Sequence, residues 1–93
     1  LLKMDWLQRH NIEMENGKFA FYHGTRADLE NNILRKKSLL ENSPQAAMEW
    51  GETNTRNDKR RRLNVYKVLV DIFDIETGFW ATTNKDLPVT KVG

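Results

Sequence analysis

The stretch Phe21–Leu29 reads FYHGTRADL and joins an apolar strand pattern to the signals of a helix start. Its apolar residues before His23 predict a strand. Thr25 is followed three residues later by Asp28, as at a helix N-terminus, where a threonine oxygen accepts from unpaired backbone N–H groups and an acid favours the positive end of the helix dipole. We therefore expect the strand to turn after His23 into a helix over residues 26–37. The buried stripe of that helix would consist of Leu29, Ile33 and Leu34.

The residues before this stretch predict a helix and a hairpin that lead into the strand. Apolar residues recur at helical spacing over residues 2–10, which indicates a short amphipathic helix. Residues 12–14 and 18–22 alternate apolar with other side chains on either side of Asn16-Gly17, which is the strongest short-range signal for a β-hairpin.

Three further segments are expected after the predicted helix over 26–37. Residues 39–41 are long enough only for a very short strand. Ser43 and Pro44 then start another helix, because serine is a favoured N-cap and proline suits the first helical position, and Gly51 ends it. Residues 52–62 contain no apolar side chain, which indicates an exposed loop.

The strongest strand signal lies in residues 65–73, which are almost all β-branched, aromatic or apolar. Such a run belongs in the middle of a sheet with both faces covered. Thr77-Gly78 predicts a turn, residues 79–82 a returning strand, and residues 88–92 a last strand near a sheet edge. The order of helix, hairpin, helices and strands predicts an α+β fold.

The composition bounds the class of protein. With 93 residues, the chain is expected to form a single domain over residues 1–93 with a modest core. The absence of cysteine excludes disulfides and thiolate metal sites, and with only two histidines we expect no zinc site. No apolar run approaches the roughly 20 residues that cross a bilayer, so we expect a soluble protein without membrane association, cytoplasmic unless it is exported. The chain begins at Leu1 rather than Met, which indicates a processed form or an excerpt of a longer chain.

The first candidate for chemistry is the pair His23-Gly24. A glycine before a helix N-terminus lets a ligand approach the backbone, and the unpaired N–H groups there favour anions such as a diphosphate. His23, at the strand end, is placed to hydrogen-bond a hydroxyl. The structural alternative is that Gly24 only makes the turn and that His23 is a satisfied core or edge residue.

The segment Tyr22–Leu29 resembles the opening of the rifampin ADP-ribosyltransferases, whose motif reads Tyr-His-Gly-Thr-Lys-Ala-Asp/Glu-Leu. It is similar, more loosely, to the His-Gly-Thr opening of other ADP-ribosyltransferase-fold proteins, including RNA 2′-phosphotransferases. Residues 46–51 resemble the family's Ala-Ala-x-Trp-Gly helix with one residue inserted. Residues 65–68 resemble its central strand, and residues 86–93 its Glu-Pro-Leu-x-Ile-Val-Gly strand.

This resemblance implies a split β-sheet of ADP-ribosyltransferase type with short flanking helices, and NAD as the substrate. The histidine would hold a ribose hydroxyl, the glycine backbone would pair with the nicotinamide carboxamide, and the threonine would support that turn. The cofactor-binding residues that it implies are Tyr22, His23, Gly24 and Thr25.

The implied chemistry passes through an oxocarbenium-like ribose cation after nicotinamide leaves, so the site needs an aromatic clamp and a carboxylate. The family's clamp tyrosine would fall at Leu39 or Leu40. The family acid lies just beyond the central strand, where Glu76 is the nearest candidate and Asp74 the next, whereas the layout of the wider fold favours Asp86. We take Glu76 and Asp86 as the catalytic candidates; the structural alternative for each acid is a turn or surface role.

The basic charge of the chain is local, because Arg56, Lys59 and Arg60–Arg62 lie within seven positions although the formal net charge is only +2. This run is either a solvated loop or an electrostatic contact for phosphate, from a nucleic acid or from the NAD diphosphate. No aromatic residue interleaves with it, so base stacking is not expected.

The resemblance therefore implies an NAD-dependent ADP-ribosyltransferase, of toxin, phage or resistance type, that modifies an unidentified protein, nucleic acid or small molecule. The alternative is a non-catalytic module of the same fold that binds a protein or a nucleic acid through the loop Arg56–Arg62. A third hypothesis is an RNA 2′-phosphotransferase-like activity, for which the several required arginines have no assigned positions.

Overall fold

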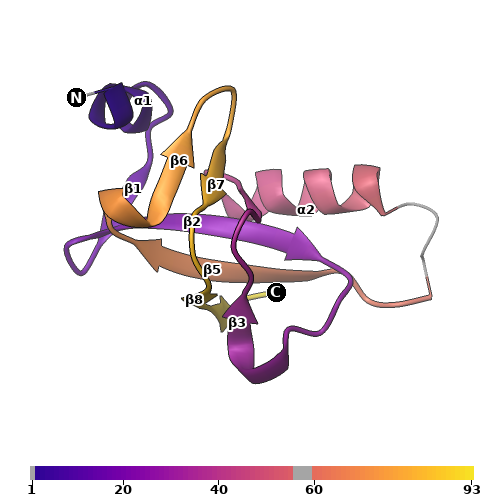
Figure 1. Ribbon diagram of the computed structural model, residues 1–93. Helices are drawn as coiled ribbons and strands as arrows, with labels where there is room; N and C mark the ends of the chain where they lie inside the picture. The colour runs from indigo at the N-terminus through magenta and orange to yellow at the C-terminus, as the bar shows by residue number, and fades with distance from the viewer. Residues whose placement is uncertain (1, 56–59) are drawn as a thin grey trace.

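The centre of the fold is a long antiparallel pair of strands, β2 (Lys18–Thr25) and β5 (Asn64–Val70). The computed structural model of the protein describes residues 2–55 and 60–93, and Figure 1 shows this pair crossing the molecule. Two short strands, β1 (Glu13–Glu15) and β9 (Thr90–Lys91), complete an antiparallel sheet in the order β1-β2-β5-β9.

The predicted hairpin is confirmed. β1 and β2 pair with Glu15 opposite Lys18, and the turn between them has positive φ at Asn16 (54°) and Gly17 (78°). A two-residue turn of this hand needs positive φ at both positions, which asparagine and glycine adopt more readily than other residues.

Two smaller antiparallel sheets lie beside the main one. One has the order β4-β7-β6, and the other pairs β3 with β8. Their bounds are β3 (Ile33–Leu34), β4 (Leu39–Leu40), β6 (Ile75–Thr77), β7 (Ala81–Thr83) and β8 (Leu87–Pro88). With two helices added, the predicted α+β class is confirmed.

Three expected strands have different bounds in the structure. The strand expected over 65–73 ends at Val70 and is followed by a 3₁₀ turn, η2 (Ile72–Asp74). The returning strand begins at Ala81, because Phe79 and Trp80 are exposed in the turn. The last strand is broken into β8 and β9, since the chain leaves one sheet for the other at the buried Val89.

Both helix starts agree with the sequence. α1 (Leu2–Arg9) buries Trp6 and Leu7, as its spacing predicts. α2 (Pro44–Asn54) begins at Ser43, whose Oγ accepts a hydrogen bond from the N–H of Ala46 at 3.0 Å.

The expected end of α2 is wrong, because the helix continues through Gly51 to Asn54. Gly51 is buried, and a β-carbon built on it would lie 2.6 Å from Cδ1 of Leu63 and 3.5 Å from the carbonyl carbon of Gly24. Glycine therefore leaves room here for the side chain of Leu63 and does not end the helix.

The helix expected over residues 26–37 is also wrong. β2 continues through Gly24 to Thr25, and the chain then forms a bend, a 3₁₀ turn, η1 (Glu30–Asn32), and the strand β3. Asn31, Asn32 and Lys37 have φ values of 56°, 54° and 68°, in the left-handed region that an α-helix excludes.

The two helix-start residues make other contacts. Thr25 Oγ1 accepts from the N–H of Ala27 at 3.1 Å, which closes a local turn instead of capping a helix. Asp28 Oδ1 accepts from Nδ2 of Asn64 at 3.4 Å. The same side-chain chemistry therefore stabilises a loop against the start of β5.

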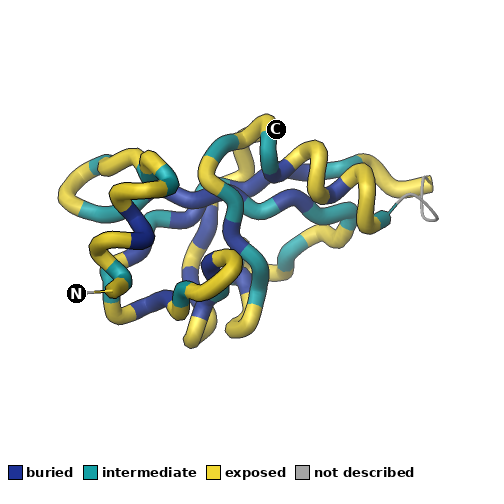
Figure 2. Tube along the Cα trace, turned by 90° about the horizontal axis from the view of Figure 1, so that it is seen from above, coloured by how far each residue is buried: buried dark blue, intermediate teal, exposed yellow. Residues whose placement is uncertain are grey.

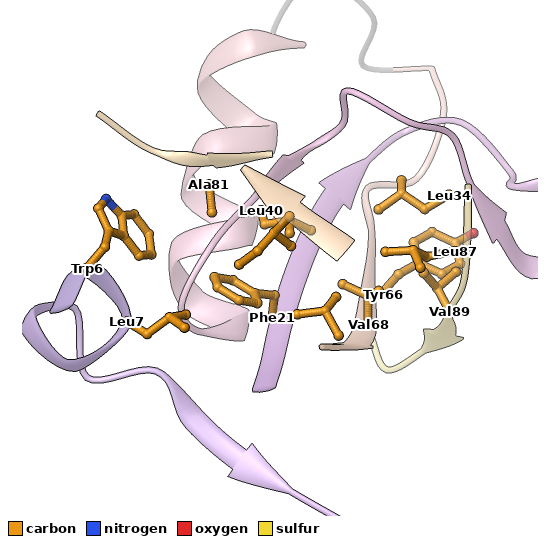
Figure 3. Close-up of a cluster of buried hydrophobic side chains, with 12 residues drawn as sticks. Trp6, Leu7, Phe21, Leu34, Leu40, Tyr66, Val68, Ala81, Leu87 and Val89 are labelled. Carbon is orange, nitrogen blue, oxygen red and sulfur yellow. The ribbon is translucent and has the colours of Figure 1, made fainter. Parts of the chain in front are cut away.

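The main core lies between one face of the β2–β5 pair and the smaller sheets. Figure 3 shows Phe21 and Val68 of the central strands facing Leu40 and Ala81, with Leu7 of α1 beside them. A second cluster, Tyr22, Ala47 and Val65, lies on the opposite face under α2. The central strands are thus covered on both sides, as predicted for residues 65–73, and Figure 2 shows their buried segments inside an exposed periphery.

The expected loop over 52–62 begins later than predicted, since residues 52–54 belong to α2. Arg60, Arg61 and Arg62 are exposed as expected, whereas Arg56 and Lys59 lie outside the described residues. Over the described ranges, none of the helices is both long and apolar enough to span a membrane.

Candidate functional site

His23 lies at the place where the sheet β4-β7-β6 meets the main sheet. Tyr22 and Glu41 exchange two backbone hydrogen bonds there, at 2.9 and 2.7 Å. The imidazole Nδ1 of His23 is 2.7 Å from the carbonyl oxygen of Leu39. Because a carbonyl only accepts, Nδ1 must carry the proton, and in the neutral ring Nε2 is then an acceptor.

Burial disfavours the charged form of this histidine. Desolvation lowers the pKa of His23 below its ordinary value, and the hydrogen bond to Leu39 opposes that effect only in part. His23 therefore presents a fixed tautomer with an acceptor nitrogen, which is what a sugar hydroxyl requires of a protein partner.

Gly24 is buried, and its backbone groups face the edge of β2 that points away from β5. Backbone groups alternate along a strand, so the N–H and C=O of Gly24 point to the same edge as those of Tyr22, which bond Glu41. Val65, directly opposite Gly24, bonds instead to Gly93. Within residues 2–55 and 60–93, no backbone partner is found for the N–H or C=O of Gly24.

The face of Gly24 that lacks a side chain is occupied by α2. A β-carbon there would overlap the carbonyl oxygen of Ala47. The expectation that Gly24 makes a turn before a helix is therefore wrong: Gly24 is a strand residue, and its missing side chain lets α2 lie against β2.

The four predicted cofactor-binding residues do not lie together on one face. Strand alternation places His23 and Thr25 on the face opposite Tyr22, which is buried with Ala47 and Val65. Gly24 contributes its backbone edge only. The structure therefore brings His23, Thr25 and the edge of Gly24 together and separates Tyr22 from them.

The candidate acids have partners of their own. Glu76, exposed on β6, forms an ion pair with Lys3 at 3.2 Å. Asp86, before β8, accepts at Oδ1 from the N–H of Lys36 at 2.8 Å. In the described part of the chain, neither carboxylate forms a hydrogen bond or ion pair with His23.

Strand register distinguishes the two acids. Glu76 lies directly opposite Thr82, and Thr82 lies opposite Leu39, so their side chains share one face of the sheet β4-β7-β6. Leu39 is also the residue whose carbonyl holds His23. Glu76 therefore shares a sheet face with the side chain of Leu39, and no contact between described residues joins it to His23.

The third acid, Asp74, is a structural residue. It is buried, its Oδ2 accepts from the N–H of Asp71 at 2.9 Å, and its Oδ1 lies 3.0 Å from Nζ of Lys85. Burial alone raises the pKa of Asp74, but the Asp71 hydrogen bond and the Lys85 charge together hold it below its usual value. These bonds close η2, and each carboxylate oxygen of Asp74 has a partner within the protein.

Sequence reasoning missed residues that become neighbours only through pairing. Tyr66 lies opposite His23, and Lys91 lies opposite Tyr66, so the three form a row across β2, β5 and β9. Glu41 meets Tyr22 at the strand edge, and burial raises the pKa of its carboxyl. Nothing near Glu41 in the sequence indicates this partner.

The predicted basic loop borders a surface cavity of about 460 Å³, here called the basic cavity. Arg26 ties the loop to the domain, because it donates to the carbonyl of Arg61 at 2.7 Å and to Thr55 Oγ1 at 2.8 Å. The cavity is lined by Arg26, Asp28, Arg61, Arg62, Asn64 and Lys91. It adjoins the row that contains His23, since Asn64 lies opposite Thr25.

In the ranges that the structure describes, no three histidine, aspartate or glutamate side chains gather as a metal site would require. No protein-family model, curated protein or solved structure matches this chain.

Proposed function

We propose that this protein is an ADP-ribosyltransferase-type domain that binds NAD and transfers ADP-ribose to an acceptor. The observation that carries the proposal is the acceptor Nε2 of His23, next to the backbone N–H and C=O of Gly24, for which the described residues supply no backbone partner. A ribose hydroxyl donates to such a nitrogen, and a carboxamide offers one donor and one acceptor that match the C=O and N–H of Gly24.

The meeting of the two sheets supports the same proposal. Among the described residues, the chain directly after β4 meets the edge of β2 at one bridge, between Tyr22 and Glu41, and Gly24 lies two residues further along that edge. A sheet that divides in this way leaves backbone groups for a ligand, as the resemblance of Tyr22–Leu29 to the transferase opening implies.

The reaction would begin with cleavage of the bond between nicotinamide and the ribose C1′. The bonding electron pair leaves with the nicotinamide nitrogen, and positive charge develops on the ribose. An acceptor nucleophile then forms the new bond to C1′ and gives up its proton to a base. A carboxylate near C1′ lowers the barrier by stabilising this charge or by orienting the nucleophile.

Glu76 is the first candidate for this carboxylate. It lies on the strand row that reaches Leu39, and its exposed ion pair with Lys3 is of a type that contributes little to stability and is readily exchanged. Asp86 is the second candidate, but its bond to the N–H of Lys36 supports a turn.

Calorimetric titration with NAD and detection of released nicotinamide test the proposal. We expect His23→Ala to bind NAD about fivefold more weakly, because one hydrogen bond of about 1 kcal/mol is lost. Glu76→Gln should keep NAD binding and lose nicotinamide release, and Asp86→Asn is measured beside it.

The matched control is His10→Ala, because His10 stacks on Trp6 at 3.8 Å and is the other histidine of the chain. Absence of both NAD binding and nicotinamide release in the unmodified protein would refute the proposal. Equal NAD affinity of the two histidine variants would refute the assignment of the pocket.

The second candidate function is a non-catalytic module that binds a macromolecule through basic residues. It is favoured by the absence of an aromatic residue at Leu39 and Leu40, where the resemblance places the clamp tyrosine. Leu40 is buried in the core, and Leu39 is aliphatic. Under this reading, binding would be salt-sensitive and would disappear when Arg60, Arg61 and Arg62 are replaced by alanine, whereas His23→Ala would have no effect.

A further inference from the structure

Three surface cavities adjoin one another along one side of the molecule. The basic cavity shares Asp28 with a second cavity of about 470 Å³, and that cavity shares Arg35 and Asp86 with a third of about 680 Å³. We call the three together the cavity row. It is formed by the chain after β2, the turn between β3 and β4, and the chain around β8 and β9.

The cavity row collects most of the described basic side chains that have no ion pair with a described residue. Among the described lysines and arginines that form no ion pair with a described residue, all but Arg9 and Arg60 line it. Its acids are fewer, and two of them, Asp28 and Asp86, already accept hydrogen bonds from the protein. The basic residues of the row that form no ion pair with a described residue, here called its unpaired basic residues, are Arg35, Lys36, Lys37, Arg61, Arg62 and Lys91.

The turn Arg35–Lys37 is held firmly in the row. The N–H of Lys37 donates to the carbonyl of Thr83 at 2.7 Å, the N–H of Lys36 donates to Asp86, and Thr83 Oγ1 donates to the carbonyl of Arg35 at 3.1 Å. Lys37 has a φ of 68°, where glycine or asparagine is the usual residue. The backbone conformation at residue 37 favours glycine, but the chain has a lysine there, and this lysine adds a positive charge to the cavity row.

Asn64 adds a directional group to the floor of the basic cavity. Its side chain is almost completely buried, with 3 % of the residue exposed, and Nδ2 points to Asp28 Oδ1. The opposite amide orientation would set two acceptor oxygens against each other, so Oδ1 is the free end. No described residue donates to Oδ1. A buried acceptor without a donor is costly, which indicates a ligand with an N–H or O–H at this position.

We propose that the cavity row binds single-stranded RNA, with phosphates on its unpaired lysines and arginines and one ribose 2′-hydroxyl donating to Asn64 Oδ1. A nucleic-acid strand carries one negative phosphate per nucleotide, which suits basic residues that are spread over adjoining cavities. The ribose 2′-hydroxyl would supply the hydrogen-bond donor that Asn64 Oδ1 lacks, and DNA has no such hydroxyl. No aromatic side chain lines the row, so recognition depends on the backbone and little on base sequence.

The proposal concerns binding and does not require that NAD be bound. Where both proposals hold, RNA is the acceptor class of the transferase. His23→Ala is therefore expected to leave RNA binding unchanged, so that loss of NAD binding and loss of RNA binding are separate results.

Fluorescence anisotropy with a labelled single-stranded RNA of mixed sequence, and DNA of the same sequence, tests the proposal on the full chain. We expect RNA to bind more tightly than DNA, and the logarithm of affinity to fall linearly with the logarithm of salt concentration. The combined variant Arg35→Gln, Lys36→Gln, Lys37→Gly should reduce this slope by about 2, since each phosphate contact of a single strand contributes about 0.7.

The matched control removes three charges at the other end of the molecule, through Lys3→Gln, Arg9→Gln and Lys18→Gln. It should keep the salt slope of the unmodified protein. Equal slopes for the two triple variants would overturn the location of the RNA site, and competition by polyglutamate as strong as that by RNA would overturn the choice of partner.

The role of Asn64 is tested from the ligand side, which leaves the folded protein untouched. RNA with 2′-O-methyl groups should bind as weakly as DNA, because the hydroxyl donor is lost. Asn64→Ala should lower the affinity for RNA to that for DNA and leave the affinity for DNA unchanged. This assignment would be overturned if 2′-O-methyl RNA bound as tightly as unmodified RNA. It would also be overturned if an RNA duplex bound more tightly than the single strand.

Discussion

Gly24 lies directly beneath Ala47, so close that a β-carbon on the glycine would overlap the alanine carbonyl oxygen. This contact, more than any turn, explains the glycine in the stretch Phe21–Leu29. It brings α2 onto the face of β2 and leaves the strand edge beside His23 to supply backbone groups.

Gly24→Ala is expected to destabilise the protein by about 3 kcal/mol or more, because the atom in the way belongs to a helix backbone and cannot rotate aside. Urea denaturation measures the loss. Gly51→Ala is the control, since its β-carbon would meet the mobile end of Leu63 and alanine improves helix propensity by about 1 kcal/mol. A loss from Gly51→Ala as large as that from Gly24→Ala would contradict the explanation.

His23 should make stability depend on pH below its ordinary pKa of 6.5. Burial lowers the pKa in the folded state, so the unfolded chain takes up the proton first. The contribution of His23 to the free energy of unfolding is therefore present above pH 6.5. It is lost as the pH falls from 6.5 through the lower pKa that His23 has in the folded state. His23→Gln should flatten this part of the pH profile, and imidazole ¹⁵N shifts should report a proton on Nδ1. A proton on Nε2 alone would contradict the bond to Leu39.

Asp74→Asn should destabilise the protein by about 2 kcal/mol at neutral pH, because a charged acceptor is lost from the bonds that close η2. The folded pKa of Asp74 is depressed, so its contribution is present above its ordinary value of 3.8 and is lost as pH falls through the folded value. Lys85→Gln removes only the ion pair and should cost less than about 1 kcal/mol. Chemical denaturation at neutral and acidic pH distinguishes the two; equal losses would show that the bond to Asp71 contributes nothing.

Lys37→Gly should leave stability unchanged within about 1 kcal/mol, because relief of the left-handed conformation offsets the greater freedom of glycine in the unfolded chain. Lys36→Gly is the matched control at a neighbouring residue without positive φ, and should cost about 1 kcal/mol. Thermal unfolding of both variants checks the difference. A larger loss from Lys37→Gly than from Lys36→Gly would mean that the lysine side chain itself stabilises the turn.

Local chemistry was enough to predict several elements. Asn16-Gly17 predicts the hairpin because these residues adopt the positive φ that the turn needs, and Ser43 predicts the start of α2 because its oxygen satisfies a free N–H of that helix. The apolar run after Asn64 predicts a strand covered on both faces, which β5 is.

The segment after Thr25 could not be read in the same way. The spacing of Leu29, Ile33 and Leu34 suits a helix, yet the structure uses Ile33 and Leu34 as the strand β3 paired with β8. Intrinsic preference is a weak determinant, and pairing with a partner more than fifty residues away overrides it here.

The sequence by itself determined the α+β class, the hairpin and the start of each helix, because each depends on a few neighbouring residues. Only the tertiary structure decided that His23 bonds Leu39, that Gly24 supports α2 and that Asn64 lies in a basic cavity beside Lys91. These contacts join residues far apart in the chain, and they depend on how all the apolar faces are buried together rather than on any local pattern.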